Sequence, residues 1–375
     1  MLRNKRKYLV ALGATILALL GAEFVARAVL STPVSPGPLV PDPELLFRLV
    51  PDSDWTWSMP QSDGPPRVVP FHVSSQGLRD RTYGDKTEGT FRILCIGDSF
   101  TMGHGLEDEK DTYPKQLEAL LNARSKFGRV EAINAGVIAW GVWQSGAWLQ
   151  REGLAFEPDF IVLQTYAGND VRDSLTRVGE YLDCDEAGYV NQMRQFRYEN
   201  RPAIRLDRRL RNLSYLYAAI SRAVLRGPAA DTIHFDCGRR FSYEVMLKES
   251  YPSLEKAWKL FEEDVADVAA WCTNHDVPYV VFNVPGPYDI SDAIFEELLD
   301  GADPDLYERG KGTRRVEEAF TRREISWLPL REVFLSAPDR DALFIPMDGH
   351  LSVEGCRLLA EEVAAYVAGQ DSLLP

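Results

Sequence analysis

A serine, a histidine and an aspartate stand at two places in this sequence where they can act together on an ester. Ser99 directly follows a Gly-Asp pair that closes the apolar run 93–96, and His350 stands two residues after Asp348. A serine hydroxyl needs an adjacent base to become a nucleophile. In extended backbone, residues two apart point to the same side, so Asp348 can hold the imidazole of His350 in one tautomer. These residues predict a Ser-His-Asp site for acyl transfer.

Two alternatives accompany this prediction. Ser99 can instead cap the backbone N–H groups of a following helix, which is a common structural role of serine. His104 lies five residues after Ser99 and is a rival candidate for the base, although the glycines on both sides of it favour an exposed or site-lining loop position.

Acyl transfer also requires hydrogen-bond donors for the negatively charged oxygen of the tetrahedral intermediate, and losing one donor typically costs about 10²–10³ in rate. Candidates stand at two further turns that follow apolar runs. They are the backbone N–H groups of residues 134–141 and the side chain of Asn169.

The elements that position these residues alternate between strands and helices. Short apolar runs closed by small turn residues predict buried parallel strands, and ligands of such sheets bind outside the carboxyl ends of the strands. The predicted strands are 93–96, 130–133, 160–163 and 277–282, with a possible fifth at 325–328; predicted helices begin near 112, cover 254–272 and run from Ser352 to about 367. This order predicts an α/β fold with a doubly wound parallel sheet.

The N-terminal segment differs from the rest. Residues 1–30 combine a basic start at residues 3–7 with the uncharged run 8–22, which is typical of an export signal or a membrane anchor. We favour an uncleaved single-pass transmembrane helix with its N-terminus inside; Ala26-Arg27-Ala28 is the alternative cleavage site. The rest of the chain is then expected to be periplasmic or extracellular.

The remaining domain boundaries come from composition. Residues 31–43 are rich in proline and predict a semi-rigid linker. Residues 44–90 carry turn signals without clear periodicity and predict an extension packed on the main domain, 91–370. An arginine-rich insertion at about 172–251, helical over 206–225, is predicted to cover the strand ends; its arginines form a solvated face or meet an anionic polymer or lipid head groups.

Composition and charge argue against several classes of protein. The chain has 375 residues with 45% hydrophobic and 26% charged residues, as in globular proteins, and its net charge of −14 argues against nucleic acid as a partner. The five cysteines show no metal-binding spacing. Cys95, Cys272 and Cys356 are expected in the core, whereas Cys184 and Cys237 are candidates for a disulfide in an oxidising compartment.

The ordered motifs GDSF, NAG, GND and DGH resemble those of the SGNH hydrolases, the GDSL esterase superfamily, over about residues 71–367. The run RILCIGDSFTMGHG is similar to the membrane-anchored bacterial branch. The resemblance implies a flavodoxin-like three-layer α/β/α sandwich that hydrolyses esters, often acetyl esters on carbohydrate. It implies Ser99 as nucleophile and first oxyanion donor, Asn169 as the side-chain donor, His350 as base and Asp348 as its orienting carboxylate.

The chain departs from the family pattern at two positions. The remaining oxyanion donor is usually a glycine five residues after the asparagine of the NxG motif, and here that residue is Ala139. The N–H of an alanine serves there if φ is negative, and otherwise Gly136 or Gly141 would have to donate. The last motif is usually D-x-x-H, whereas this chain has the shorter Asp348-Gly349-His350.

Three functions fit these residues. The first is a serine esterase that removes acyl groups from an envelope saccharide or a similar ester, with no metal or organic cofactor. The second is an O-acyltransferase in which a sugar hydroxyl intercepts the same acyl-enzyme. The third is a catalytically degenerate binding or scaffold subunit. The sequence does not identify a protein partner.

Overall fold

The computed structural model describes residues 2–29, 38–42, 44–61, 64–124, 128–178, 180–184, 190–195, 210, 214–217, 220, 243–250, 252–299 and 304–370. The chain forms two compact units. One comprises Met1–Pro43 with Tyr198–Phe235, and the other comprises Glu44–Arg197 with Asp236–Pro375. Residues 44–90 therefore belong to the same unit as Ser99 and His350.

The first unit contains helix α1 (Leu2–Val29) and strand β1 (Leu39–Asp42). Within it, the Glu23 carboxylate accepts hydrogen bonds from Ser214 Oγ and Leu216 N at 2.7 and 3.0 Å. Across the part of the chain that the structure describes, no helix combines the length and the apolar character needed to cross a membrane. The transmembrane helix predicted within residues 1–30 thus lacks support in the structure.

The centre of the second unit is a four-stranded parallel sheet in the order β10-β7-β5-β6. Its strands are β5 (Thr90–Gly97), β6 (Arg129–Gly136), β7 (Phe160–Thr165) and β10 (Tyr279–Asn283). Both faces are buried, as the continuous apolar runs of these strands require. The predicted α/β fold with a parallel sheet is confirmed.

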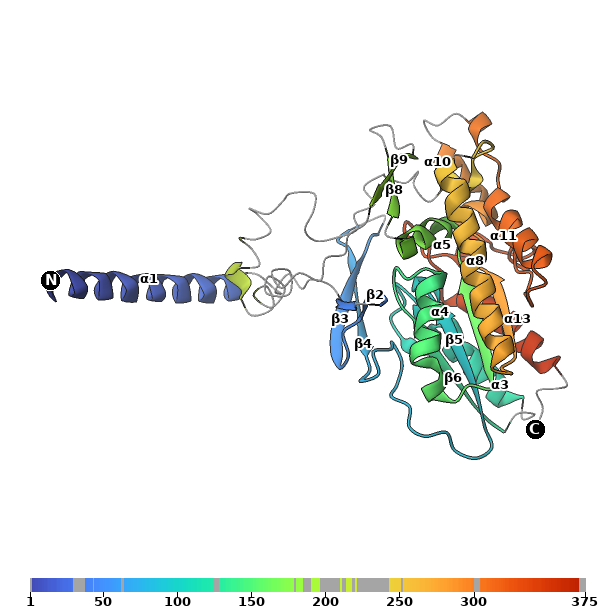
Figure 1. The fold of residues 1–375 in the computed structure, drawn as a ribbon, viewed down its shortest axis with the longest axis horizontal. Helices are drawn as coiled ribbons and strands as arrows, with labels where there is room; N and C mark the ends of the chain where they lie inside the picture. The colour runs from blue at the N-terminus through green and yellow to red at the C-terminus, as the bar shows by residue number, and fades with distance from the viewer. Residues whose placement is uncertain are drawn as a thin grey trace. The chain divides into compact units, whose positions relative to one another are not determined.

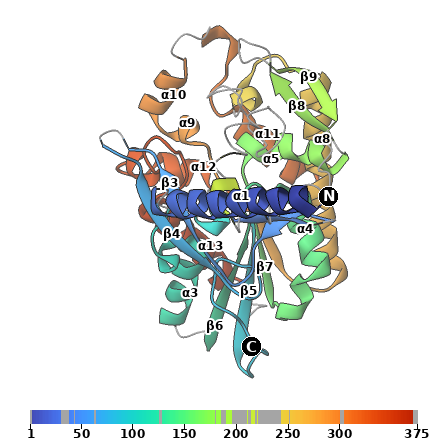
Figure 2. The same ribbon diagram turned by 90° about the vertical axis from the view of Figure 1, so that its left-hand side faces the viewer.

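Helices cover both faces of this sheet. Helix α3 packs against β6 and α13, and α4 packs against α8; Figure 2 shows the two pairs on opposite sides of the strands. The helices of the second unit are α2 (Ser99–Met102), α3 (Tyr113–Ala123), α4 (Val142–Arg151), α5 (Ala167–Asp173), α8 (Pro252–Asn274), α9 (Pro287–Ile290), α10 (Asp292–Leu299), α11 (Lys311–Arg322), α12 (Arg331–Leu335) and α13 (Val353–Ala368). Short 3₁₀ turns are η1 (Glu109–Asp111), η2 (Gly153–Phe156), η3 (Ser174–Val178), η5 (Pro304–Leu306) and η6 (Asp341–Leu343).

The predicted fifth strand is wrong. Residues 325–328 contribute a single parallel bridge, between Trp327 and Val281. Pro329 follows at once, and proline lacks the N–H that a continuing ladder needs.

The segment 44–90, whose sequence shows no clear periodicity, nevertheless forms regular strands. It contains β2 (Leu46–Leu49) and an antiparallel hairpin of β3 (Ser53–Met59) and β4 (Arg67–Val73), visible in Figure 1 beside the parallel sheet. Alternate side chains of the hairpin are buried, which is the pattern of strands with one face on a core.

The predicted helical insertion begins differently. β8 (Glu180–Cys184) and β9 (Val190–Gln195) pair as an antiparallel hairpin. The residues that join them include Gly188, and glycine between two short runs of this kind is a sequence signal for a hairpin. Most of the arginine-rich stretch, most of the predicted helix 206–225 and the whole of Cys237 lie outside the described residues. Most of the predicted linker and the side chain of Cys184 lie outside them too. The structure therefore does not bear on the candidate disulfide. Cys95, Cys272 and Cys356 are buried free thiols, as expected.

Candidate active site

Ser99 is the first residue of the short helix α2, directly beyond the carboxyl end of β5. The capping role belongs to its neighbour, because Asp98 Oδ1 accepts a hydrogen bond from Phe100 N at 2.8 Å. The side chain of Ser99 is therefore free for another partner. The alternative in which Ser99 caps the following helix is therefore wrong, because Asp98 is the N-cap of α2.

The hydroxyl of Ser99 meets His350 across 251 positions of sequence. Ser99 Oγ lies 2.8 Å from His350 Nε2, and His350 Nδ1 lies 2.6 Å from Asp348 Oδ1. The same carboxylate oxygen accepts a hydrogen bond from the backbone N–H of His350 at 3.2 Å. Asp348 thus holds both the ring and the main chain of His350, so the shorter D-x-H spacing still brings the carboxylate to Nδ1.

The loop that carries this pair ends in a capped helix. Ser352 is the N-cap of α13, and its Oγ accepts a hydrogen bond from Gly355 N at 3.2 Å. Gly349, between the aspartate and the histidine, has φ of +87°, which glycine adopts without strain. The sharp turn and the cap together direct the His350 ring toward Ser99.

The protonation of Asp348 suits an orienting carboxylate. Burial raises its pKa, but the hydrogen bond to His350 and the charge of that ring outweigh burial and hold the pKa below its ordinary value. An ionised Asp348 accepts the Nδ1 proton, which leaves His350 Nε2 able to take a proton from the Ser99 hydroxyl.

Asn169 is tied to the residue before the serine. Its Nδ2 donates to Asp98 Oδ2 at 3.0 Å and approaches Asp173 Oδ2 at 3.5 Å. Burial raises the pKa of both aspartates. The short bond to Asp98 places the amide next to the nucleophile turn, and the long contact to Asp173 leaves its second N–H weakly held. The role of Asn169 as an oxyanion donor remains a prediction.

Ala139 has an unusual backbone conformation. Its φ is +63°, in the left-handed region that costs a non-glycine residue about 1–2 kcal/mol. The condition of a negative φ, set from the sequence, is therefore not met. The substitute glycines are not available either, because Gly136 N donates to Asn134 Oδ1 and Gly141 N donates to Gln144 Oε1. Among the described residues, none accepts a hydrogen bond from Ala139 N.

His104 lines the site without contacting Ser99 Oγ as a base would. Its Nε2 lies 3.8 Å from Asp348 Oδ2, and its ring lies 4.6 Å from that of His350 and 4.5 Å from that of Trp57, measured between centroids. Burial, reinforced by the charge of His350, lowers the pKa of His104 to about 3. The side chain of His104 is therefore uncharged at neutral pH and lines the site.

Sequence reasoning missed two residues that hold the site. The guanidinium of Arg79 donates to the carbonyl oxygens of Met102, Gly103 and Leu106, all in the turn after Ser99. Burial lowers the pKa of Arg79 to about 10. Asp80 Oδ2 accepts from Asn134 N at 2.7 Å, at the end of β6. An Arg-Asp pair in a turn carries no signal of this role in a single sequence.

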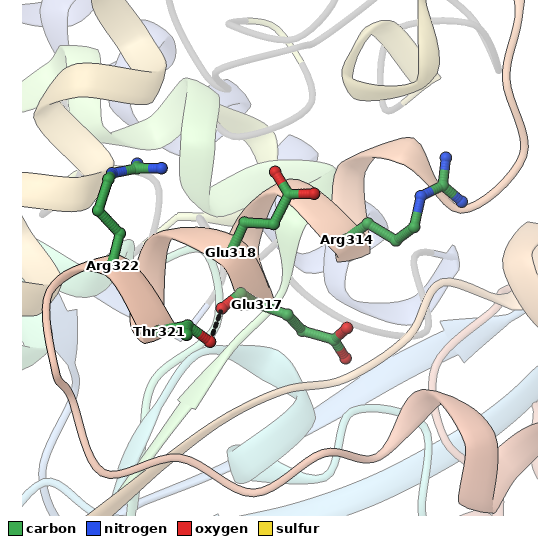
Figure 3. Close-up of a pocket in the computed structure, with 5 residues that line it drawn as sticks. All are labelled: Arg314, Glu317, Glu318, Thr321 and Arg322. Atoms are coloured by element: carbon green, nitrogen blue, oxygen red, sulfur yellow. Dashed lines mark hydrogen bonds between the residues drawn. The ribbon is translucent and has the colours of Figure 1, made fainter.

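One set of described side chains has the proximity of metal ligands. Ligand atoms of His104, Asp348 and His350 lie within 4.8 Å of one another. Asp348 and His350 are already bonded to each other, and His350 is bonded to Ser99, so we assign no metal there. A surface pocket elsewhere is lined by Arg314, Glu317, Glu318, Thr321 and Arg322 (Figure 3). All five come from α11, and none belongs to the site around Ser99.

Comparisons with known proteins give only distant matches. No family model matches the chain, and no curated protein matches its sequence. Among solved structures it is similar to a lipase/acylhydrolase from Enterococcus faecalis, with 12% identity, 75% of this chain and 96% of that chain covered, and a TM-score of 0.41. It is also similar to an acetyl xylan esterase from Geobacillus stearothermophilus, with 11% identity, coverage of 74% and 94%, and a TM-score of 0.38. A lipolytic protein of the G-D-S-L family from Desulfitobacterium hafniense matches with 11% identity, coverage of 73% and 98%, and a TM-score of 0.38. Likenesses this distant assign neither a family nor a reaction.

Proposed function

We propose that this protein is a serine ester hydrolase that works through an acyl-enzyme on Ser99. The observation that carries the proposal is the continuous chain from Ser99 Oγ through His350 to Asp348, with distances of 2.8 and 2.6 Å. Hydrogen bonds of this length in this order are what a serine needs to lose its proton as it attacks.

The reaction proceeds in two halves. Ser99 Oγ attacks the ester carbonyl while His350 Nε2 takes the hydroxyl proton, and Asp348 stabilises the charged imidazole. His350 then returns the proton to the departing alcohol, which leaves an acyl group on Ser99. In the second half a water molecule gives its proton to His350, attacks the acyl carbonyl and releases the acid. The N–H groups of Ser99 and Ala139 and the amide of Asn169 are the proposed donors to the oxyanion. Ala139 is kept in this set despite its positive φ because its N–H has no acceptor among the described residues.

Replacing the nucleophile tests this proposal. The full chain should hydrolyse p-nitrophenyl acetate, and Ser99→Ala should lose about 10⁴–10⁶ in kcat because no other described hydroxyl is bonded to His350. A fluorophosphonate probe should label the peptide that contains Ser99. Unchanged turnover in Ser99→Ala would remove the assignment, and absence of both labelling and turnover would favour the scaffold function.

The substrate class is a further part of the proposal. We propose an acylated, in particular acetylated, saccharide, supported by the ordered SGNH motifs of the sequence. Hydrolysis and transfer share the acyl-enzyme, so an acyl donor with an added oligosaccharide should be tested by mass spectrometry. A mass gain of one acyl group per oligosaccharide indicates an acyltransferase, whereas release of free acid indicates a hydrolase.

The location of the protein is also proposed from sequence. The basic start followed by the run 8–22 supports export, with the second unit outside the cytoplasm. Fractionation of cells that produce the full chain, compared with a chain lacking residues 1–30, tests this. Cytoplasmic recovery of the full chain would contradict it.

A further inference from the structure

The loop between β6 and α4 starts beside the nucleophile turn. Gly97 and Gly136 end their strands in register, and Val137 N donates to Gly97 O at 3.1 Å. Two residues later the loop reaches Ala139, which is exposed and has φ of +63°. The loop therefore offers, three residues beyond the strand end that pairs with Gly97, a backbone N–H that has no acceptor among the described residues.

An alanine does not take this conformation by itself. Left-handed φ values are natural for glycine and unfavourable for residues with a Cβ, and they persist only where the surroundings impose them. Some part of the structure must therefore hold Ala139 in place.

The residues that follow Ala139 are bonded to the N-terminal segment. The indole N–H of Trp140 donates to Phe47 O at 2.9 Å. Gln144 bridges two backbones, since its Oε1 accepts from Gly141 N at 2.8 Å and its Nε2 donates to Leu45 O at 3.2 Å. Trp140 and Gln144 are each only 1% exposed. Buried N–H groups cannot be left without acceptors at low cost, so these bonds fix the part of the loop that directly follows Ala139.

Resting on the proposed function, we propose that Trp140 and Gln144 are positioning residues that brace the loop on residues 45–47 and so hold Ala139 N–H as the second oxyanion donor. The brace replaces what a glycine would provide without assistance at this position. Residues 45–47, which precede the hairpin, therefore help to position the site. Because an oxyanion exists only in the transition state and intermediate, loosening the brace lowers kcat and leaves substrate binding nearly unchanged.

Removing one brace bond tests the proposal. Trp140→Phe keeps an aromatic ring and deletes the indole N–H, and Gln144→Met deletes both amide bonds. Each should lower kcat for p-nitrophenyl acetate about 10- to 100-fold, less than the loss of a whole donor, with KM changed by less than about 3-fold. Adding Ala139→Gly to either variant should restore most of kcat, because glycine adopts a positive φ without the brace.

The chain offers a matched control. Trp148, on α4, is likewise a buried tryptophan, but its indole donates to Glu152 Oε2 at 3.0 Å and not to the segment 45–47. Trp148→Phe should keep kcat within about 2-fold, which we take as the ordinary range for a change away from such a site.

The outcomes separate the brace from the proposed function. If the unmodified chain neither hydrolyses the ester nor reacts with the fluorophosphonate, the esterase assignment fails. If the chain is active but Trp140→Phe and Gln144→Met behave like Trp148→Phe, or if Ala139→Gly rescues neither, the brace is overturned. Should Trp140→Phe fail to fold, as judged by circular dichroism, Gln144→Met and its rescue decide the question.

Discussion

At the scale of single residues, the site depends on which partner each polar group finds. Asp98 caps α2 and binds Asn169, which leaves the Ser99 hydroxyl to His350. Asp348 is ionised and bonded to the ring, whereas His104 is neutral and only faces the carboxylate. His350 and His104 lie next to each other but have different roles. His350 is hydrogen-bonded to Ser99 and Asp348, whereas His104 only lies near the carboxylate.

Exchanging the orienting carboxylate for an amide separates these duties. Asp348→Asn should lower kcat by about 10³–10⁴, because an amide no longer favours the tautomer that leaves Nε2 free to accept. His104→Gln should keep kcat within about 10-fold, since His104 is not bonded to Ser99. Steady-state kinetics on a p-nitrophenyl ester measures both. A larger loss in His104→Gln than in Asp348→Asn would reverse the assignment of the base and its partner.

Glu244 predicts how stability depends on pH. Burial raises its pKa from 4.5 to about 8, with Arg172 acting in the opposite direction. A folded-state pKa above the unfolded value stabilises the fold fully below about pH 4.5, and this contribution is lost as the pH rises to about 8. Urea unfolding should show it as a decline of the order of 5 kcal/mol across that interval, because each unit of pKa difference is worth about 1.4 kcal/mol. Glu244→Gln should remove this part of the decline, whereas the exposed Glu296→Gln should preserve it; equal slopes in both variants would contradict the prediction.

At the scale of elements, the site is assembled where strand ends and their turns crowd together. The turn after β5 and the end of β6 touch so closely that Gly136 admits no side chain. A Cβ there would lie 2.7 Å from Thr101 C and would also clash with Met102 N. Arg79 supports the same turn by binding three of its carbonyl oxygens.

This crowding makes Gly136 a test of the contact between the two elements. Gly136→Ala should destabilise the fold by about 1–3 kcal/mol, because backbone atoms must move to admit a methyl group. It should also reduce esterase activity by displacing the turn that carries Ser99. Gly84→Ala is the matched control, since nothing lies within 4 Å of its Cβ position. Chemical unfolding measures the free energy of unfolding of both variants. Equal values would contradict the prediction, because they would mean that the turn moves to admit the methyl group at little cost.

At the scale of the whole molecule, the segment before the sheet belongs to the site-bearing unit. Residues 44–59 place buried side chains in its core and backbone acceptors under the loop of Ala139. The fully or nearly buried members are Leu45, Phe47, Leu49, Trp57 and Met59.

Two truncations follow from this arrangement. A chain that begins at residue 44 should fold cooperatively and keep esterase activity, because it retains the whole N-terminal part of the second unit. A chain that begins at residue 60 should be inactive and aggregate, because five buried apolar side chains are lost, each contributing about 1.5–3 kcal/mol. Thermal unfolding by circular dichroism, with activity measured in parallel, distinguishes them. Full activity in the shorter chain would contradict the role of this segment.

The sequence by itself determined the local features. Apolar runs of a few residues marked the four strands, the spacing of apolar residues marked α8, and Ser352 marked the start of α13. These features depend on neighbouring residues, so their signals are contained in short windows of sequence. The positions of Ser99 and His350 at element ends followed from the same windows. Their residue types suggested the pairing, and the family resemblance supported it.

Tertiary structure decided everything that joins distant parts of the chain. It gave the cap to Asp98 through a hydrogen bond that sequence could assign to either neighbour, and it imposed a positive φ on an alanine whose own preference is the opposite. It also placed Arg79 under the nucleophile turn and Trp140 against Phe47, 93 positions away. The physical reason is that buried donors and acceptors must find partners wherever the fold brings them, and a single sequence does not record that choice.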